Sequence, residues 1–244
     1  MEKLYNQIYF SSDHRSSQEE IMDDFNFQGA EMEALLSDLE RVNKWLGGNK
    51  ITLNGIAILL RDVPKNAPIT IVDLGCGDGE LLRQCAHYGS KFGYDFKLIG
   101  IDANEHILST ARKRSIEYQN ITYQKLDVTS SKASWPTMDI VLCTLFLHHF
   151  STEGISSLLE NLSAKAKVGI VINDLERSKL AFRLFQLFSR LFLKTNTARF
   201  DGLVSIARGF KQKELTRLSE NIKGTSSFIK WRWAFRYQWI LKKE

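Results

Sequence analysis

Proline is scarce in this sequence, with only Pro64, Pro68 and Pro136 among 244 residues. No internal repeat and no low-complexity tract is present either. The clearest break in the chain is therefore the short linker PKNAP, which Pro64 and Pro68 bracket. We take residues 1–66 as an N-terminal helical cap and residues 67–244 as a second domain.

Cysteine is equally sparse, and its pattern excludes two kinds of site. Cys76, Cys85 and Cys143 are odd in number and irregularly spaced, with no C-x-x-C pair and no H-x-x-x-H pair. A disulfide framework and a cysteine or histidine metal site are therefore not indicated. We expect free thiols in a reducing compartment and no bound metal.

Long apolar runs are missing as well. No segment is apolar for long enough to span a bilayer, and the first twenty residues lack the basic-then-apolar order of a signal peptide. These absences predict a soluble, cytoplasmic protein. The net charge of +5 is mild and the charges are spread along the chain, so a nucleic-acid partner is not expected.

Before the linker, the hydrophobic period is helical. The segment MEALLSDLERVNKWL, residues 32–46, places its leucines at helical spacing, and Gly47 and Gly48 then end the predicted helix. A second helix is predicted over residues 51–63. The hydrophobic content of 43% is enough for a sizeable core in the part that follows.

After the linker, short apolar runs alternate with helical segments. The predicted strands are residues 69–75, 97–103, 121–128, 138–149 and 168–174, and the predicted helices between them are residues 80–89, 105–116 and 154–165. Such alternation is typical of a parallel sheet with right-handed crossovers. Residues 227–242 alternate apolar and basic side chains and are predicted to form one long strand or a hairpin at the sheet edge, antiparallel to the rest. The predicted class is α/β, a doubly wound, mostly parallel Rossmann-like sheet with an antiparallel C-terminal strand and the N-terminal helical cap.

The stretch VDLGCGDGE, residues 72–80, follows the first predicted strand. Its glycines are spaced G-x-G-x-G rather than the G-x-G-x-x-G of dinucleotide sites, and Asp73, Asp78 and Glu80 surround them. These acids would repel a pyrophosphate but attract a ligand that carries an ammonium and a sulfonium. Two more acids, Asp102 and Asp127, end the next two strands, where ligands bind in open parallel sheets. S-adenosylmethionine fits this pattern as the cofactor.

These motifs, together with the strand MDIVLCTLFLHHF, resemble those of class I S-adenosylmethionine-dependent methyltransferases over residues 67–175. The double histidine is similar to that of the branch related to ubiquinone and menaquinone methyltransferases. Further segments resemble a narrower bacterial group that is associated with polyketide or aryl-pigment pathways. These segments are EEIMDD (19–24), DLERVNKWLGG (38–48), NDLERS (173–178) and RFDGLVSIARGF (199–210).

The resemblance implies a set of cofactor contacts. Asp102 would bind the ribose hydroxyls and Asp127 the adenine amino group, whereas the alternative for Asp127 is that it only caps the following turn. The residues implied to contact the methionine part are Asp73, Gly75, Cys76, Gly77, Gly79, Cys143 and Thr144, and those implied to flank the adenine are Ala103 and Val128. Cys76 and Cys143 are also read as small buried hydrophobic residues rather than nucleophiles.

Methyl transfer from a sulfonium is an in-line displacement, which depends on alignment and exclusion of water and benefits from a base near the acceptor. His148 and His149 close the fourth predicted strand, and alternation along a strand predicts that they point to opposite faces. One of them is the candidate base; the alternative is that both hydrogen-bond backbone and shape the loop. His14 and Arg15 are candidates for a closing N-terminal segment, and Arg177 for binding an anionic acceptor or for a salt bridge with Asp174.

The segment SKLAFRLFQLFSRLFLK, residues 178–194, is apolar over most of its helical surface and has a narrow cationic stripe. We predict a helical lid insert over residues 178–210, with Phe185 or Phe188 facing a hydrophobic acceptor. A homodimer contact and a helix on a membrane surface are the alternatives.

The predicted function is methyl transfer from S-adenosylmethionine to the oxygen or carbon of a hydrophobic, aromatic or quinol-like small molecule. Two alternatives are a non-catalytic sensor or partner protein that binds S-adenosylmethionine, and an RNA methyltransferase. The latter is disfavoured because no separate RNA-binding module and no Asn/Asp-Pro-Pro-Tyr motif is present.

Overall fold

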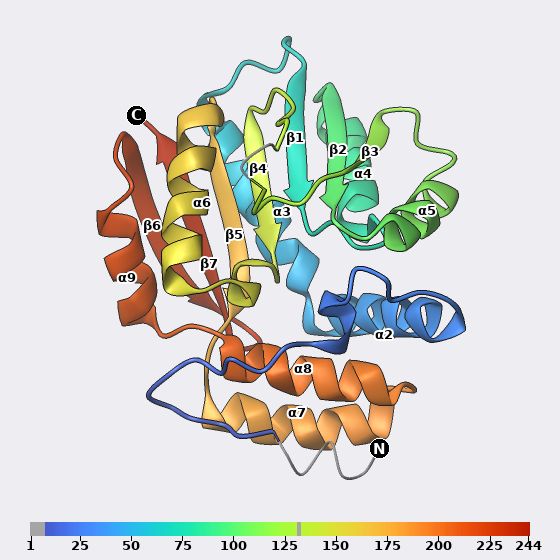
Figure 1. Ribbon diagram of the computed structural model, residues 1–244. Helices are drawn as coiled ribbons and strands as arrows, with labels where there is room; N and C mark the ends of the chain where they lie inside the picture. The colour runs from blue at the N-terminus through green and yellow to red at the C-terminus, as the bar shows by residue number, and fades with distance from the viewer. Residues whose placement is uncertain (1–7, 131–132) are drawn as a thin grey trace.

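A single seven-stranded sheet organises the chain in the computed structural model, which describes residues 8–130 and 133–244 (Figure 1). The strand order is β3-β2-β1-β4-β5-β7-β6. The strands are β1 (Ile69–Leu74), β2 (Phe96–Asp102), β3 (Ile121–Lys125), β4 (Ile140–Thr144), β5 (Gly169–Leu175), β6 (Thr225–Arg232) and β7 (Arg236–Lys243). The first seven residues of the predicted cap lie outside the described residues.

The predicted sheet class is confirmed. β1 to β5 pair in parallel, and β7 pairs antiparallel with β5. The C-terminal segment is the hairpin rather than the single strand, because β6 pairs antiparallel with β7. The central strands are buried on both faces and carry Ile, Val and Leu, as parallel strands covered by helices require.

The helices around the sheet are α3 (Gly48–Leu59), α4 (Glu80–Phe92), α5 (Glu105–Arg114), α6 (Thr152–Lys165) and α9 (Gln212–Glu220), with a short 3-10 turn η2 (Leu60–Asp62) after α3. α3 packs directly on the sheet: a Cβ at Gly55 would lie 2.4 Å from Cγ1 of Val171 on β5. Because α3 belongs to the layer on the sheet, not all of residues 1–66 stand apart from it. The domain boundary at residue 66 therefore stays a prediction.

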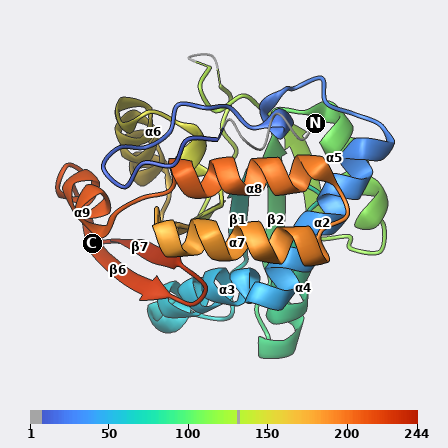
Figure 2. The same ribbon diagram turned by 90° about the horizontal axis from the view of Figure 1, so that it is seen from below.

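A second layer of helices covers the carboxyl ends of the parallel strands (Figures 1 and 2). We call this the lid layer. It consists of the 3-10 turn η1 (Ile21–Asp23) with α2 (Ala30–Leu46), α7 (Lys179–Phe192) and α8 (Asn196–Arg208). The predicted insert thus forms two helices, of which α8 lies nearer the sheet and α7 lies beside it. In the described part of the chain, no helix is both long and apolar enough to cross a membrane.

Candidate cofactor and acceptor cavity

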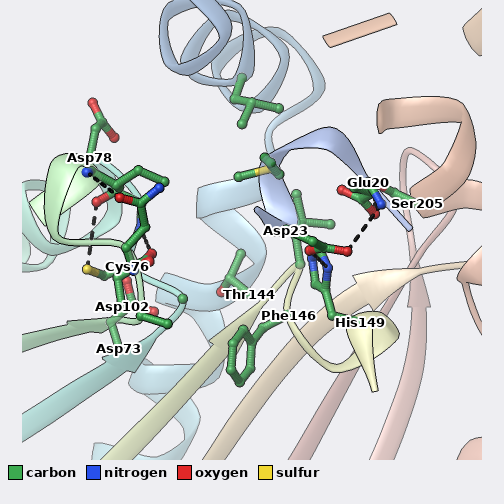
Figure 3. A pocket seen from close by; sticks show the side chains of 18 of the residues that line it. Glu20, Asp23, Asp73, Cys76, Asp78, Asp102, Thr144, Phe146, His149 and Ser205 are labelled. Carbon is green, nitrogen blue, oxygen red and sulfur yellow. Dashed lines mark hydrogen bonds and ion pairs between the residues drawn. The ribbon is translucent and has the colours of Figure 1, made fainter. Parts of the chain in front are cut away.

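A cavity of about 500 Å³ lies between the carboxyl ends of the strands and the lid layer. On the sheet side it is lined by the glycine turn and by the ends of β2 and β4, and on the other side by η1, α2 and α8. Its volume is in the range of small-molecule sites. Figure 3 shows Asp73, Asp78 and Asp102 on one side of the cavity and Glu20, Asp23, His149 and Ser205 on the other.

The glycine turn is shaped by the residues packed behind it. Gly75 and Gly77 have φ values of 66° and 53°, a region that side chains disfavour, and a Cβ on Gly75 would lie 2.5 Å from the Phe146 ring. The Gly77 N–H donates to Oδ2 of Asp102 over 3.3 Å, which ties the turn to the end of β2. Gly75 and Gly77 line the cavity, whereas Gly79 lies at the start of α4 and outside the lining.

The acids near the glycine turn differ in their partners: Glu80 accepts a hydrogen bond from the Gln84 side chain, and only Asp78 among them forms a salt bridge with a described residue. Asp78 is paired with Arg83 and Arg114, so its charge is already neutralised. Asp73 and Asp102 have no such partner, and burial together with the charge of Asp102 raises the pKa of Asp73 to about 8. Burial also raises the pKa of Asp102, although the backbone N–H groups of Asn104 and Gly77 oppose it. The cavity therefore presents two buried carboxyl groups that a cationic or hydroxylated ligand can satisfy.

Asp127 lies at the cavity edge beyond β3 and has local partners. Its Oδ1 accepts hydrogen bonds from the N–H and the hydroxyl of Thr129, at 2.8 and 2.7 Å, so Asp127 caps the following turn, and it also lines the cavity. Ala103, Val128 and Thr144 line the same space. Cys143 is buried in β4 outside the lining, and burial raises the thiol pKa of both Cys143 and Cys76 well above the usual value. Neither thiol has the character of a nucleophile.

The two histidines are arranged differently from the prediction. β4 ends at Thr144, Leu145 has a φ of 52°, and the chain then forms the 3-10 turn η3 (Leu147–His149). Because the histidines lie on a turn and not on a strand, their rings do not point to opposite faces, and the ring centroids of His148 and His149 are 4.2 Å apart. The prediction of opposite faces is wrong, and both residues line the cavity.

His148 is buried between two carboxylates. Its Nδ1 is 2.7 Å from Oδ1 of Asp174 on β5, and its Nε2 is 3.2 Å from Oε1 of Glu20. Burial alone would lower the pKa of His148, but the two carboxylates outweigh it and raise this pKa to about 9. The pKa values of Glu20 and Asp174 are lowered in turn, against the effect of their burial, by the histidines. At neutral pH His148 is therefore an imidazolium with both nitrogens occupied.

His149 is less enclosed and stands at the cavity wall. Its Nδ1 is 2.7 Å from Oδ1 of Asp23, and the other oxygen of Asp23 accepts a hydrogen bond from Arg208 over 3.0 Å. Figure 3 shows the His149 ring beside Asp23. Glu20, His148 and His149 also bring three atoms of metal-ligating type within 4.8 Å of one another. A cation there would have to displace the contact between His148 and Glu20.

Several residues of this wall were not predicted. Asp201 on α8 accepts hydrogen bonds from the N–H groups of Ile21 and Met22, and Ser205 donates to Glu20 over 2.8 Å. Arg208 donates to the carbonyl of His148 over 3.0 Å. Five of the unpredicted residues fall in the segments 19–24 and 199–210, which resemble other proteins but had no predicted role. They are Glu20, Asp23, Asp201, Ser205 and Arg208.

The residues predicted to contact the acceptor lie outside the cavity lining. Arg15 donates to the carbonyls of Arg208 and His148, and His14 hydrogen-bonds Ser11 in the exposed N-terminal segment. Arg177 is fully buried and pairs with Glu214 over 2.7 Å, so it forms a salt bridge with a partner other than the predicted Asp174.

Phe185 and Phe188 also lie outside the cavity lining, because α8 stands between α7 and the cavity. Phe185 packs against Gly202 of α8, where a Cβ would lie 2.3 Å from its ring, and Phe188 contacts Trp45 edge to face. The predicted lid side chains are therefore replaced at the cavity by residues of α8.

Comparison with known proteins gives one family match. A family model described as a methyltransferase domain matches residues 71–169. This segment runs from β1 to the start of β5 and contains the glycine turn, Asp102, Asp127 and both histidines. This part of the chain is therefore similar to methyltransferase domains. No curated protein sequence matches the chain.

Solved structures match over most of the chain. The magnesium protoporphyrin IX methyltransferase of Synechocystis PCC 6803, with bound S-adenosylmethionine, is 18% identical with a TM-score of 0.54, and the match covers 81% of this chain and 80% of that one. The plantazolicin methyltransferase BpumL, in complex with S-adenosylhomocysteine, is 14% identical with a TM-score of 0.61, covering 87% and 95%. A putative O-methyltransferase of Nostoc punctiforme PCC 73102 is 14% identical with a TM-score of 0.59, covering 100% and 67%. At these identities the likeness shows that the chain shares the Rossmann-like fold of these proteins.

Proposed function

We propose that this chain is an S-adenosylmethionine-dependent methyltransferase that methylates a hydrophobic small molecule at a hydroxyl or an activated carbon. One observation carries the proposal. On the glycine side, the buried carboxyl groups of Asp73 and Asp102, which have no cationic partner among the described residues, open onto the same cavity as the paired histidines of η3. The carboxyls suit a cationic ligand with a ribose, and the histidines suit an acceptor that loses a proton.

In this proposal the glycine side of the cavity holds the cofactor. Asp102 binds the ribose hydroxyls through charge-assisted hydrogen bonds, and Asp73 lies against the cationic methionine part. Asp127, Ala103 and Val128 line the space for the adenine. When bound, S-adenosylmethionine supplies an electrophilic methyl group.

His149 is the proposed proton acceptor. His148 is excluded from this role because it is already protonated at neutral pH and both its nitrogens face carboxylates. His149 faces the cavity, and Asp23 stabilises the imidazolium that forms when a ring nitrogen takes the proton of the acceptor. His148 holds η3 in place through its contacts with Asp174 on β5 and with Glu20 beside η1. Closure of the lid layer over the cavity excludes water from the reacting groups.

The remaining wall supports an apolar acceptor. Met22, Phe25, Leu36, Leu39 and Phe150 line the cavity together with Phe146. An aromatic or quinol-like molecule would bury its ring against these side chains and present its hydroxyl to His149. The matched solved structures include a magnesium protoporphyrin IX methyltransferase and a plantazolicin methyltransferase. We therefore propose the hydrophobic class and leave oxygen and carbon acceptors as the two cases to assay.

Calorimetry tests the cofactor directly. We expect S-adenosylmethionine and S-adenosylhomocysteine to bind with a stoichiometry of one and NAD not to bind, because a pyrophosphate would meet Asp73 and Asp102. Formation of S-adenosylhomocysteine with lipophilic phenols and quinols then separates an enzyme from a non-catalytic binding protein. A preference for NAD would overturn the proposal.

Replacing Asp102 with alanine measures its share in cofactor binding. Loss of charge-assisted hydrogen bonds to the ribose should weaken S-adenosylhomocysteine binding by about 1.5–3 kcal/mol, or roughly 10- to 150-fold. Asp95→Ala is the matched control, since Asp95 is exposed just before the same strand. An unchanged dissociation constant in a folded Asp102→Ala protein would refute the ribose role.

A further inference from the structure

The outer face of α7 carries a row of exposed leucines. Leu180, Leu184, Leu187 and Leu191 are between 48% and 67% exposed. Their spacing of four, three and four residues places them on one side of the helix, and we call this row the leucine stripe. The opposite side of α7 already packs on α8 through Ala181, Phe182 and Phe185. The fold therefore does not require the leucines for its core.

The apolar surface continues beyond the stripe onto α2. Phe192 at the end of α7 is exposed and contacts the exposed Trp45 of α2 edge to face, with ring centroids 5.4 Å apart. Contiguous exposed apolar surface of this kind marks an interaction site in a folded protein.

Cations run along one flank of the leucine stripe. Lys179, Arg183 and Arg190 follow at helical spacing on the side of α7 next to the leucines, and Lys194 comes just after the helix ends at Phe192. Residues 178–194 contain no acidic residue. None of the four cations forms an ion pair with a carboxylate of the residues that the structure describes. An amphipathic helix with leucines bounded by unpaired Lys and Arg is typical of helices that lie in a membrane interface.

Charge decides between the two kinds of partner that could cover the stripe. A second copy of the chain packed through α7 would bring two cationic flanks together, with no acid on either helix to neutralise them. An anionic lipid surface instead offers phosphates to the cations and acyl chains to the leucines. We propose that the leucine stripe of α7 docks this protein on an anionic phospholipid surface, with α7 lying in the plane of the interface.

The docked orientation has a consequence for the cavity. α7 packs on α8 through Phe185 and Gly202, and Gly202 also lines the cavity. Docking therefore places the lid layer between the lipid surface and the cavity. In combination with the proposed function, on which this step rests, it brings the enzyme to the place where a hydrophobic acceptor accumulates.

Cosedimentation with vesicles tests the docking surface. We expect the full chain to bind vesicles of equal parts phosphatidylcholine and phosphatidylglycerol, to bind phosphatidylcholine alone much more weakly, and to be released by salt. The double variant Leu184→Asp, Leu187→Asp should bind the mixed vesicles at least about 10-fold more weakly. Ile116→Asp, which replaces an exposed apolar residue just after α5, is the matched control and should bind as the unaltered chain does.

A second variant and two further measurements keep the test decisive. Arg183→Gln, Arg190→Gln should lose most of the preference for the anionic vesicles while leaving the leucines intact. S-adenosylhomocysteine affinity should stay within about 2-fold in every variant, which separates lost docking from a misfolded protein or a failed cofactor assignment. No vesicle binding by the unaltered chain would overturn the proposal. So would a dimer of the unaltered chain that Leu184→Asp, Leu187→Asp converts to a monomer.

Discussion

His149→Ala is expected to lower kcat by about 100-fold or more at neutral pH while leaving the affinity for S-adenosylhomocysteine unchanged. The reason is that the two histidines of η3 have different roles. His148 is held as an imidazolium by Asp174 and Glu20, so His149 is the histidine at the cavity wall that is left to accept a proton. Turnover of a phenolic acceptor and calorimetric cofactor binding are the two measurements.

The control and a second substitution sharpen the test. His106→Ala removes an exposed histidine at the start of α5 that does not belong to the cavity lining, and it should leave kcat as it is. Asp23→Asn should lower kcat by a smaller factor, since it removes the charge that stabilises the His149 imidazolium but leaves the ring. Full turnover in a folded His149→Ala protein would assign the proton to water or to another group.

The sheet could be predicted from the sequence because its signals are local. Each parallel strand is a short β-branched run between helical segments, and the right-handed crossover rule then fixes the architecture. The predicted ends of the strands were less accurate than the predicted order of the elements. The predicted strand 138–149 stops at Thr144, since Leu145 adopts a left-handed conformation that no residue pattern announces.

The cofactor side was predictable for the same reason, whereas the opposite wall was not. Asp73, Asp102 and Asp127 each follow a strand, so their meeting at one edge follows from topology. Glu20 and Ser205 are 185 positions apart in the chain, and they meet through packing of η1 on α8. Neither has a periodic signal, so the contacts of Glu20 with Ser205 and with His148 could be found only from the tertiary structure.

Asp73→Asn is expected to weaken cofactor binding by about 10-fold or more and, at the same time, to stabilise the ligand-free protein above neutral pH. Burial and the neighbouring Asp102 raise the pKa of Asp73 from 3.8 to about 8, and none of the described residues donates a hydrogen bond to its carboxyl group. The folded chain thus binds this proton more tightly than the unfolded chain does. The stability that the protonated group contributes falls as pH rises between these two values, and the amide variant lacks that dependence.

The same shift predicts how the cofactor binds. A cationic ligand favours the ionised carboxylate, so binding to the unaltered chain should release a proton and strengthen as pH rises from about 6 to about 8. Calorimetry in two buffers of different ionisation enthalpy measures that proton, and thermal unfolding at both pH values measures the stability. Asp95→Asn, an exposed acid outside the cavity, should change neither quantity. Unaltered cofactor affinity in Asp73→Asn, or a melting temperature that does not rise at the higher pH, would show that the buried carboxyl is there for packing and not for the ligand.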